Sequence, residues 1–129
     1  MSYVSRADRY REAQVLSASP EQLLIIVYDF LTASLHRTRI AIERNDPELR
    51  CAAIDGATRA VSELLCTVDQ DRGGALGKQL VALYAYLLGE LAAVVGPNDL
   101  PKLERITGLV LQLRDAFMSA ASGVRGSVS

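Results

Sequence analysis

Residues 19–30 read SPEQLLIIVYDF, and this stretch decides the fold because it both starts a long helix and carries a surplus of apolar side chains. Ser19 suits an N-cap, Pro20 suits the first helical position, and Gln22 can return the second hydrogen bond of a capping box. From Leu24 onward a row of residues recurs at steps of four and three, which predicts an amphipathic helix packed in a bundle. This row is Leu24, Tyr28, Leu31, Leu35, Thr38 and Ile42.

The same helix has apolar residues outside that row. They are Leu23, Ile25, Ile26, Val27 and Phe30. Because they make the first turns apolar nearly all round, the helix must be covered on more than one side. We therefore expect something beyond a simple bundle neighbour to contact it.

Three more helical segments follow, and short turn signals separate them. Asp46-Pro47 ends the first helix and caps the second, Gly73-Gly74 gives a turn, and Gly96-Pro97-Asn98 gives the last. The expected helices cover residues 20–44, 47–68 and 75–95, and a fourth begins after residue 98. Short links and the absence of a strand pattern predict an all-α fold, an antiparallel four-helix bundle with a short N-terminal cap segment.

The bundle is expected to occupy residues 19–121, with two flanking segments. Residues 1–18 are a polar lead-in and are expected to form an N-terminal cap or docking segment. Residues 122–129 lack a hydrophobic period and are expected to form a disordered tail. The chain is long enough for one independent core.

Composition excludes several classes of protein. Fourteen Lys and Arg against fifteen Asp and Glu give a net charge of -1 without a basic stripe, so nucleic acid is not an expected partner. No apolar run reaches the roughly 18 residues of a membrane span, and the charged N-terminus lacks the apolar core of a signal peptide. Cys51 and Cys66 are expected to be small buried residues in a reducing compartment, which predicts a cytoplasmic protein.

The sequence lacks the residue sets of most enzymes. A single histidine, His36, cannot supply a di-iron ligand set or a catalytic triad, so we expect no enzyme activity, no metal and no cofactor. One enzymatic alternative is a histidine phosphotransfer bundle that uses His36. Histidine phosphotransfer domains carry the pattern His-x-x-Lys-Gly, whereas in this chain His36 is followed by Arg39 and Ile40 at the Lys and Gly positions.

Motifs spread over residues 10–117 resemble the flagellar secretion chaperone family FliS. They are Tyr10, Val15, Ala18-Ser19-Pro20, Leu23, Tyr28-Asp29, Ala41-Ile42-Glu43, Asp46, Glu63-Leu64, Asp69, Gly73-Gly74, Leu80, Leu83-Tyr84, Tyr86 and Arg114-Asp115-Ala116. The chain departs from the family pattern at Phe30, where Gly is usual, at Ala75, where an acidic residue is frequent, and at Phe117, where Trp is common.

The resemblance implies a cytosolic export chaperone for flagellin. Such a protein binds the disordered C-terminal segment of flagellin, prevents premature polymerisation and delivers it to the flagellar type III export gate. The resemblance further implies that Tyr10 docks the loaded complex on the gate protein FlhA, and that the client displaces Val15 and Leu16 from a groove. Alternatively, Tyr10 only packs on the bundle.

The apolar surplus of the first and third helices predicts where a client would bind. The expected flagellin-binding residues are Leu23, Ile26, Val27, Leu83, Tyr84 and Leu87. Each could instead pack in the core, because periodicity does not tell which row faces inward. The surplus could also form the face of a homodimeric structural bundle, or of a weak homodimer.

Overall fold

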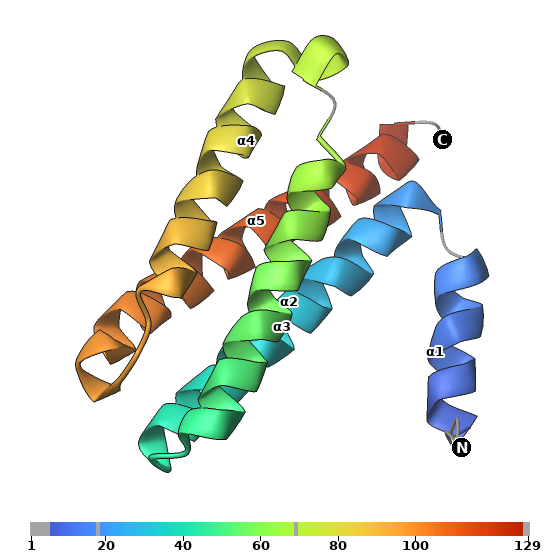
Figure 1. Ribbon diagram of the computed structural model, residues 1–129. Helices are drawn as coiled ribbons and strands as arrows, with labels where there is room; N and C mark the ends of the chain where they lie inside the picture. Colours follow the sequence, from blue (N-terminus) through green and yellow to red (C-terminus); the bar gives the residue numbers. More distant parts are fainter. Residues whose placement is uncertain (1–5, 18, 69, 128–129) are drawn as a thin grey trace.

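The chain folds into helices alone over the residues that the structure describes (Figure 1). This computed structural model describes residues 6–17, 19–68 and 70–127, and for 14–17, 70–72 and 121–127 it describes the backbone only. The elements are α1 (Arg6–Ser17), α2 (Pro20–Glu43), α3 (Pro47–Cys66), α4 (Gln70–Ala92), the 3₁₀ turn η1 (Pro97–Asp99) and α5 (Leu100–Ser127).

The capping signals work as the sequence predicts. The Ser19 hydroxyl accepts a hydrogen bond from the Gln22 backbone N–H at 3.2 Å, and the Ser19 N–H donates to the Gln22 side chain at 2.9 Å. The Asp46 carboxylate accepts from the Leu49 N–H at 3.1 Å, at the start of α3. These bonds satisfy backbone donors that the first turn of a helix leaves unpaired.

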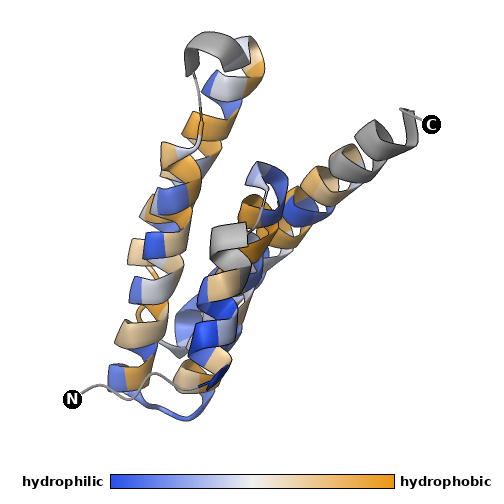
Figure 2. Cartoon of the chain, turned by 90° about the vertical axis from the view of Figure 1, so that its right-hand side faces the viewer, coloured by the Kyte–Doolittle hydropathy of each residue, from blue (hydrophilic) through white to orange (hydrophobic). Residues whose placement is uncertain are grey.

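Helices α2 to α5 form the antiparallel four-helix bundle. Helix α2 packs against α3 and α5, and α3 packs against α4. Helices α4 and α5 meet near η1 and then diverge, so that the C-terminal half of α5 rises away from α4 in both Figure 1 and Figure 2. Hydrophobic and hydrophilic stretches alternate around the helices in Figure 2, as amphipathic helices require.

The core confirms the row of the first helix. Tyr28, Leu31, Leu35, Thr38 and Ile42 are buried, and Leu24 is partly buried against them. Helix α3 contributes mostly small side chains to the core, which lets the backbones of α2 and α3 approach closely. The buried residues of α3 are Ala53, Ala57, Ala60, Val61 and Leu64.

Gly74 interrupts α4 with a φ of 55° and a ψ of -132°. This conformation lies outside the helical region and is open to glycine, which has no Cβ. The glycine turn expected before the third bundle helix is therefore present, although the assigned helix already begins at Gln70.

The lead-in is a helix, α1, which lies beside the bundle in Figure 1. Helix α5 continues to Ser127, so the backbone of residues 122–127 is helical. One feature differs from the expectations. Cys51 and Cys66 are exposed and not buried, since both lie on the outer side of α3.

Candidate binding site

An apolar cavity of about 340 Å³ opens at the end of the bundle where α4 and α5 diverge. We call it the end cavity. It is lined by α2, α4, α5 and the two residues that follow α3, and the lining residues are Leu24, Thr67, Val68, Gly73, Leu76, Gly77, Leu80, Tyr84 and Phe117. Leu76 stands at this cavity with 64% of its surface exposed. An exposed leucine beside an open apolar cavity is a typical feature of an interaction surface.

Two buried tyrosines support the floor of the end cavity. The hydroxyl groups of Tyr28 and Tyr84 lie 2.7 Å apart in a hydrogen bond between α2 and α4. Burial, together with this bond, raises the pKa of Tyr28 far above its ordinary value of 10.0. Burial also raises the pKa of Tyr84. Both hydroxyls therefore stay protonated at neutral pH, and each satisfies the other inside an apolar core.

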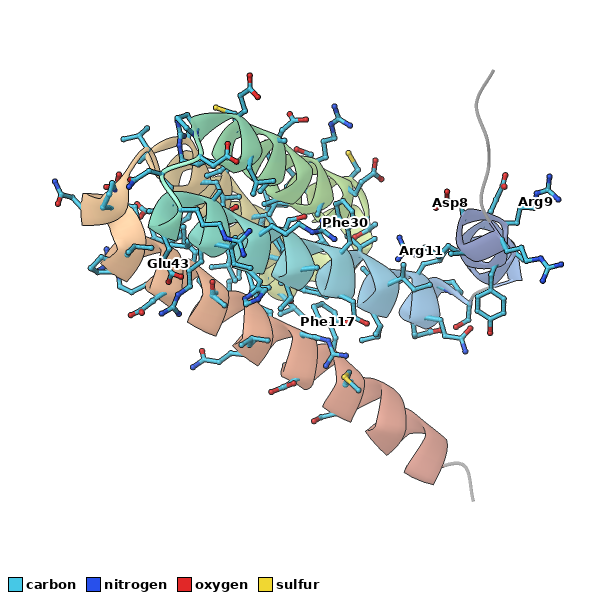
Figure 3. All side chains as sticks on the ribbon, turned by 90° about the horizontal axis from the view of Figure 1, so that it is seen from below. Asp8, Arg9, Arg11, Phe30, Glu43 and Phe117 are labelled. Carbon is cyan, nitrogen blue, oxygen red and sulfur yellow. The ribbon has the colours of Figure 1, made fainter. Side chains whose placement is uncertain are left out.

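Phe117 closes the end cavity from the side of α5. Its ring centroid lies 5.6 Å from that of Tyr28, with the planes tilted by 36°. Figure 3 shows Phe117 between α2 and α5. Phe117 thus packs on the tyrosine that anchors the core.

A second cavity, of about 450 Å³, lies between α2 and α5. We call it the α2/α5 groove. Its lining residues are Thr32, Leu35, His36, Arg39, Leu100, Leu103, Glu104, Thr107, Gly108 and Leu111. Leu35 and Leu103 are buried, whereas Leu111 is exposed. The lining therefore combines leucines with a polar edge where Arg39 lies 3.8 Å from Glu104.

An ion pair between α2 and α5 lies between these two cavities along the helices. Arg114 Nε donates to Asp29 Oδ1 at 2.6 Å. On α2, Asp29 falls between Leu24 of the end cavity and Thr32 of the groove, and on α5, Arg114 falls between Leu111 and Phe117. The hydrogen bond to Asp29 raises the pKa of Arg114 further above its ordinary range.

The predicted client-binding residues fall into two groups. Leu23 is 36% exposed, and Ile26, Val27 and Leu83 are partly buried, so these four reach the surface to different extents. Tyr84 and Leu87, with 1% and 0% exposure, are in the core. Of the six, Tyr84 alone lines the end cavity.

The docking residues lie on α1. Tyr10 is 70% exposed there, so it does not pack on the bundle in this conformation. In Figure 3, α1 is seen nearly end-on beside the bundle, with Arg9 pointing away from it and Arg11 on the side of α2. The side chains of Val15 and Leu16 lie outside the described residues.

Sequence reasoning did not choose Leu76, Leu80 or Phe117 as binding residues, yet they line the end cavity. Leu76 and Leu80 belong to the same row of the third bundle helix as Leu83 and Leu87. The adjacent Gly73-Gly74 was the available signal, because a glycine break at the start of a helix leaves its first leucines without a full set of neighbours.

His36 is exposed at the α2/α5 groove. Among the described residues, no group of three or more His, Cys, Asp or Glu side chains could hold a metal ion. None of the helices in the described part of the chain is long and apolar enough to cross a membrane.

Comparison with known proteins places the sequence in a family. The model of the family described as Flagellar protein FliS matches residues 3–124. The chain is 30% identical over 107 residues to the flagellar secretion chaperone FliS of Salmonella typhimurium, a match that covers 82% of this chain and 79% of the relative. It is 28% identical over 106 residues to the flagellar secretion chaperone FliSB of Pseudomonas aeruginosa, covering 82% and 84%.

A third relative is the flagellar secretion chaperone FliS of Bacillus subtilis, with 27% identity over 116 residues, covering 90% of this chain and 86% of the relative. These relatives are named as chaperones, so the family is not one of enzymes. Because the family match covers nearly the whole chain, the protein belongs to the FliS family of flagellar secretion chaperones.

Proposed function

We propose that this protein is a cytoplasmic export chaperone that binds the disordered C-terminal segment of flagellin. It would keep this segment from polymerising before export and would deliver it to the flagellar type III export gate. The observation that carries the proposal is the presence of two apolar cavities on the surface of a FliS-family bundle.

The shape of the surface supports a client that is long and mostly apolar. The end cavity and the α2/α5 groove together follow α2 from Leu24 to Arg39. At 1.5 Å per residue this distance is about 22 Å, which suits several turns of an amphipathic helix lying in a groove. A disordered segment loses entropy when it orders on binding, and burial of apolar surface over this length offsets that loss.

Among the described residues, binding would come from the burial of apolar surface. Leu23, Ile26, Val27 and Leu83 reach the surface, and with Leu76 and Leu80 we propose them as client contacts. Tyr84 would contact the client as part of the cavity floor, and a contact of Leu87 would require the core to open. The moderate affinity expected of such a site suits handover to another protein.

Helix α1 would carry the second role, docking on the export gate protein FlhA. The exposed ring of Tyr10 on a polar helix suits contact with another protein, since aromatic residues are enriched at interfaces. Displacement of Val15 and Leu16 by the client stays part of this proposal.

The first experiment measures binding of a flagellin C-terminal peptide by titration calorimetry, with circular dichroism to detect helix gained on binding. Leu76→Ser should weaken binding about tenfold, because it removes an apolar contact at the end cavity. Val95→Ser is the matched control, since Val95 is also 64% exposed and lies beyond the other end of α4. Failure of the unaltered chain to bind the peptide would overturn the proposal.

The docking role has its own test. Tyr10→Ala should leave flagellin binding unchanged and abolish binding to FlhA, measured with purified proteins. Tyr86→Ala, which removes another exposed tyrosine from α4, should affect FlhA binding little. Equal losses in both variants would contradict a specific role of Tyr10.

A weak homodimer would bury the same apolar surface. Sedimentation of the free chain and of its peptide complex shows whether a second copy of the chain or the peptide covers that surface. A dimer that the peptide dissociates would mean that partner and client compete for one surface.

A further inference from the structure

We propose that the Asp29–Arg114 ion pair makes the affinity for the client depend on the charge of one client side chain. The preferred client is an amphipathic helix with a hydrogen-bond donor side chain midway between two apolar anchors. This inference rests on the proposed function and concerns the same surface. We call the ion pair, together with the adjacent Asp115, the α2/α5 clasp.

Helix α5 presents one stripe in which apolar and charged positions alternate. Leu111, Arg114 and Met118 recur at steps of three and four, so they share a face of the helix. Leu111 and Met118 are exposed, whereas Arg114 is largely covered and bonded to Asp29 across the seam. Arg114 Nη1 also lies 2.8 Å from the Met118 sulfur. A helix lying along this seam would therefore meet an apolar site, a charged site and an apolar site in turn.

The distance between the apolar sites sets the spacing in the client. From Leu111, which lines the α2/α5 groove, to Met118 the helix advances about seven residues, or about 10 Å. A helical client lying parallel to α5 would need its two apolar anchors about seven residues apart. The position facing the clasp would fall about halfway between them.

The charges of the clasp decide what this middle position can be. Arg114 lies 2.6 Å from the Asp29 carboxylate and 3.9 Å from the Asp115 carboxylate, so one positive and two negative charges meet here. Both carboxylates are more than half exposed and keep free acceptor capacity. An apolar residue would desolvate them and an acidic residue would be repelled, whereas Lys, Arg, Gln or Asn would donate a hydrogen bond.

The test scans the flagellin C-terminal peptide with single Lys and single Glu substitutions, and measures the affinity of each peptide for the full-length chain. At the clasp position Glu should weaken binding two- to fivefold relative to Lys, as expected for partly exposed charges. Ala substitutions of the apolar anchors, three or four residues to either side, should weaken binding more. Higher salt should reduce the difference between Lys and Glu.

A charge-altered chaperone isolates the clasp. In Asp29→Asn/Asp115→Asn the amide oxygen of residue 29 can still accept from Arg114, but the site becomes positive, so the preference should turn toward Glu. The matched control is Asp55→Asn, which removes the carboxylate of the exposed Asp55–Arg59 pair on α3 and should leave the preference unchanged. Thermal melts show whether each variant is folded.

Two results would overturn the inference. The first is that the unaltered chain binds the peptide but has equal affinity for Lys and Glu at every position. The second is that Glu still weakens binding relative to Lys in Asp29→Asn/Asp115→Asn. Failure of the unaltered chain to bind any flagellin peptide is a separate result, because it would contradict the proposed function itself.

Discussion

The seam between α2 and α3 is closed, whereas the neighbouring pair α4 and α5 is partly open. At the closed seam, α3 places alanines and Gly56 against α2, and an added Cβ at Gly56 would lie 3.1 Å from Ser34 Oγ and 3.6 Å from the Phe30 ring. Figure 3 shows Phe30 on the side of α2 that faces α3. Helices α4 and α5 carry leucines and diverge, and the end cavity opens between them. Side-chain size at the helix contact thus decides whether a seam is core or binding surface.

The largest expected effect separates a core leucine from a cavity leucine. Leu64→Ala, at a fully buried position of α3, should lower the free energy of unfolding by about 2–5 kcal/mol, because it leaves a void in a packed core. Leu76→Ala should change it by no more than about 0.5 kcal/mol, because Leu76 is exposed. Urea denaturation measures both. Equal losses would mean that the open end is as tightly packed as the closed seam.

The tyrosine pair joins the closed half of the bundle to the open half. Tyr84→Phe leaves the buried Tyr28 hydroxyl without its partner, which should cost about 1–3 kcal/mol of stability. The double variant Tyr28→Phe/Tyr84→Phe should lose less than the sum of the two single variants, since it leaves neither hydroxyl unpaired. Additive losses in this double-mutant cycle would argue against the hydrogen bond.

Alkaline pH tests the same pair without a large change in packing. The pKa values of Tyr28 and Tyr84 are raised in the folded chain, while an unfolded chain releases these protons near 10.0. The stability due to the pair is therefore complete below that pH and is lost as the pH rises above it, at up to about 1.4 kcal/mol per pH unit for each group. Unfolding at increasing pH should show this slope, and the double phenylalanine variant should show a smaller one.

Glycine replacements compare the closed seam with an open helix face. Gly89→Ala should raise stability by about 1 kcal/mol, because a Cβ there meets nothing within 4 Å and alanine favours the helix. Gly56→Ala should gain less or lose stability, because its Cβ presses on the buried Ser34. A larger gain in the free energy of unfolding for Gly56→Ala than for Gly89→Ala would show that the contact between α2 and α3 can accommodate an added Cβ.

The smallest effect is expected at the turn where α4 and α5 still meet. The Asp99 carboxylate accepts hydrogen bonds from the Val95 and Gly96 N–H groups at 3.0 and 3.1 Å, which lowers the pKa of Asp99. Its contribution is present above the ordinary value of 3.8 and is lost as the pH falls through the lowered pKa. Asp99→Asn should therefore be slightly less stable at neutral pH, with a difference that vanishes in acid. Thermal melts across this range measure it.

Much of the candidate site could not be predicted from the sequence. The surplus of apolar residues on the first and third bundle helices was visible, but two rows on one helix are equivalent in a linear pattern. Leu83 reaches the surface, whereas Leu87 of the same row is buried, because α4 and α5 diverge toward the start of α4 and stay close only near η1. The exposure of Cys51 and Cys66 has the same origin, since composition does not tell which side of α3 meets solvent.

By itself the sequence determined the local structure: where α2 and α3 begin, where glycine interrupts the start of α4, and which residues of α2 recur at the helical period. Caps, turns and hydrophobic periods act between residues close in the chain, so they are readable there. Only the tertiary structure decided that Asp29 meets Arg114 and that the space beside Leu76 stays open. Such features depend on the distance and angle between helices, which the summed packing of many distant side chains sets.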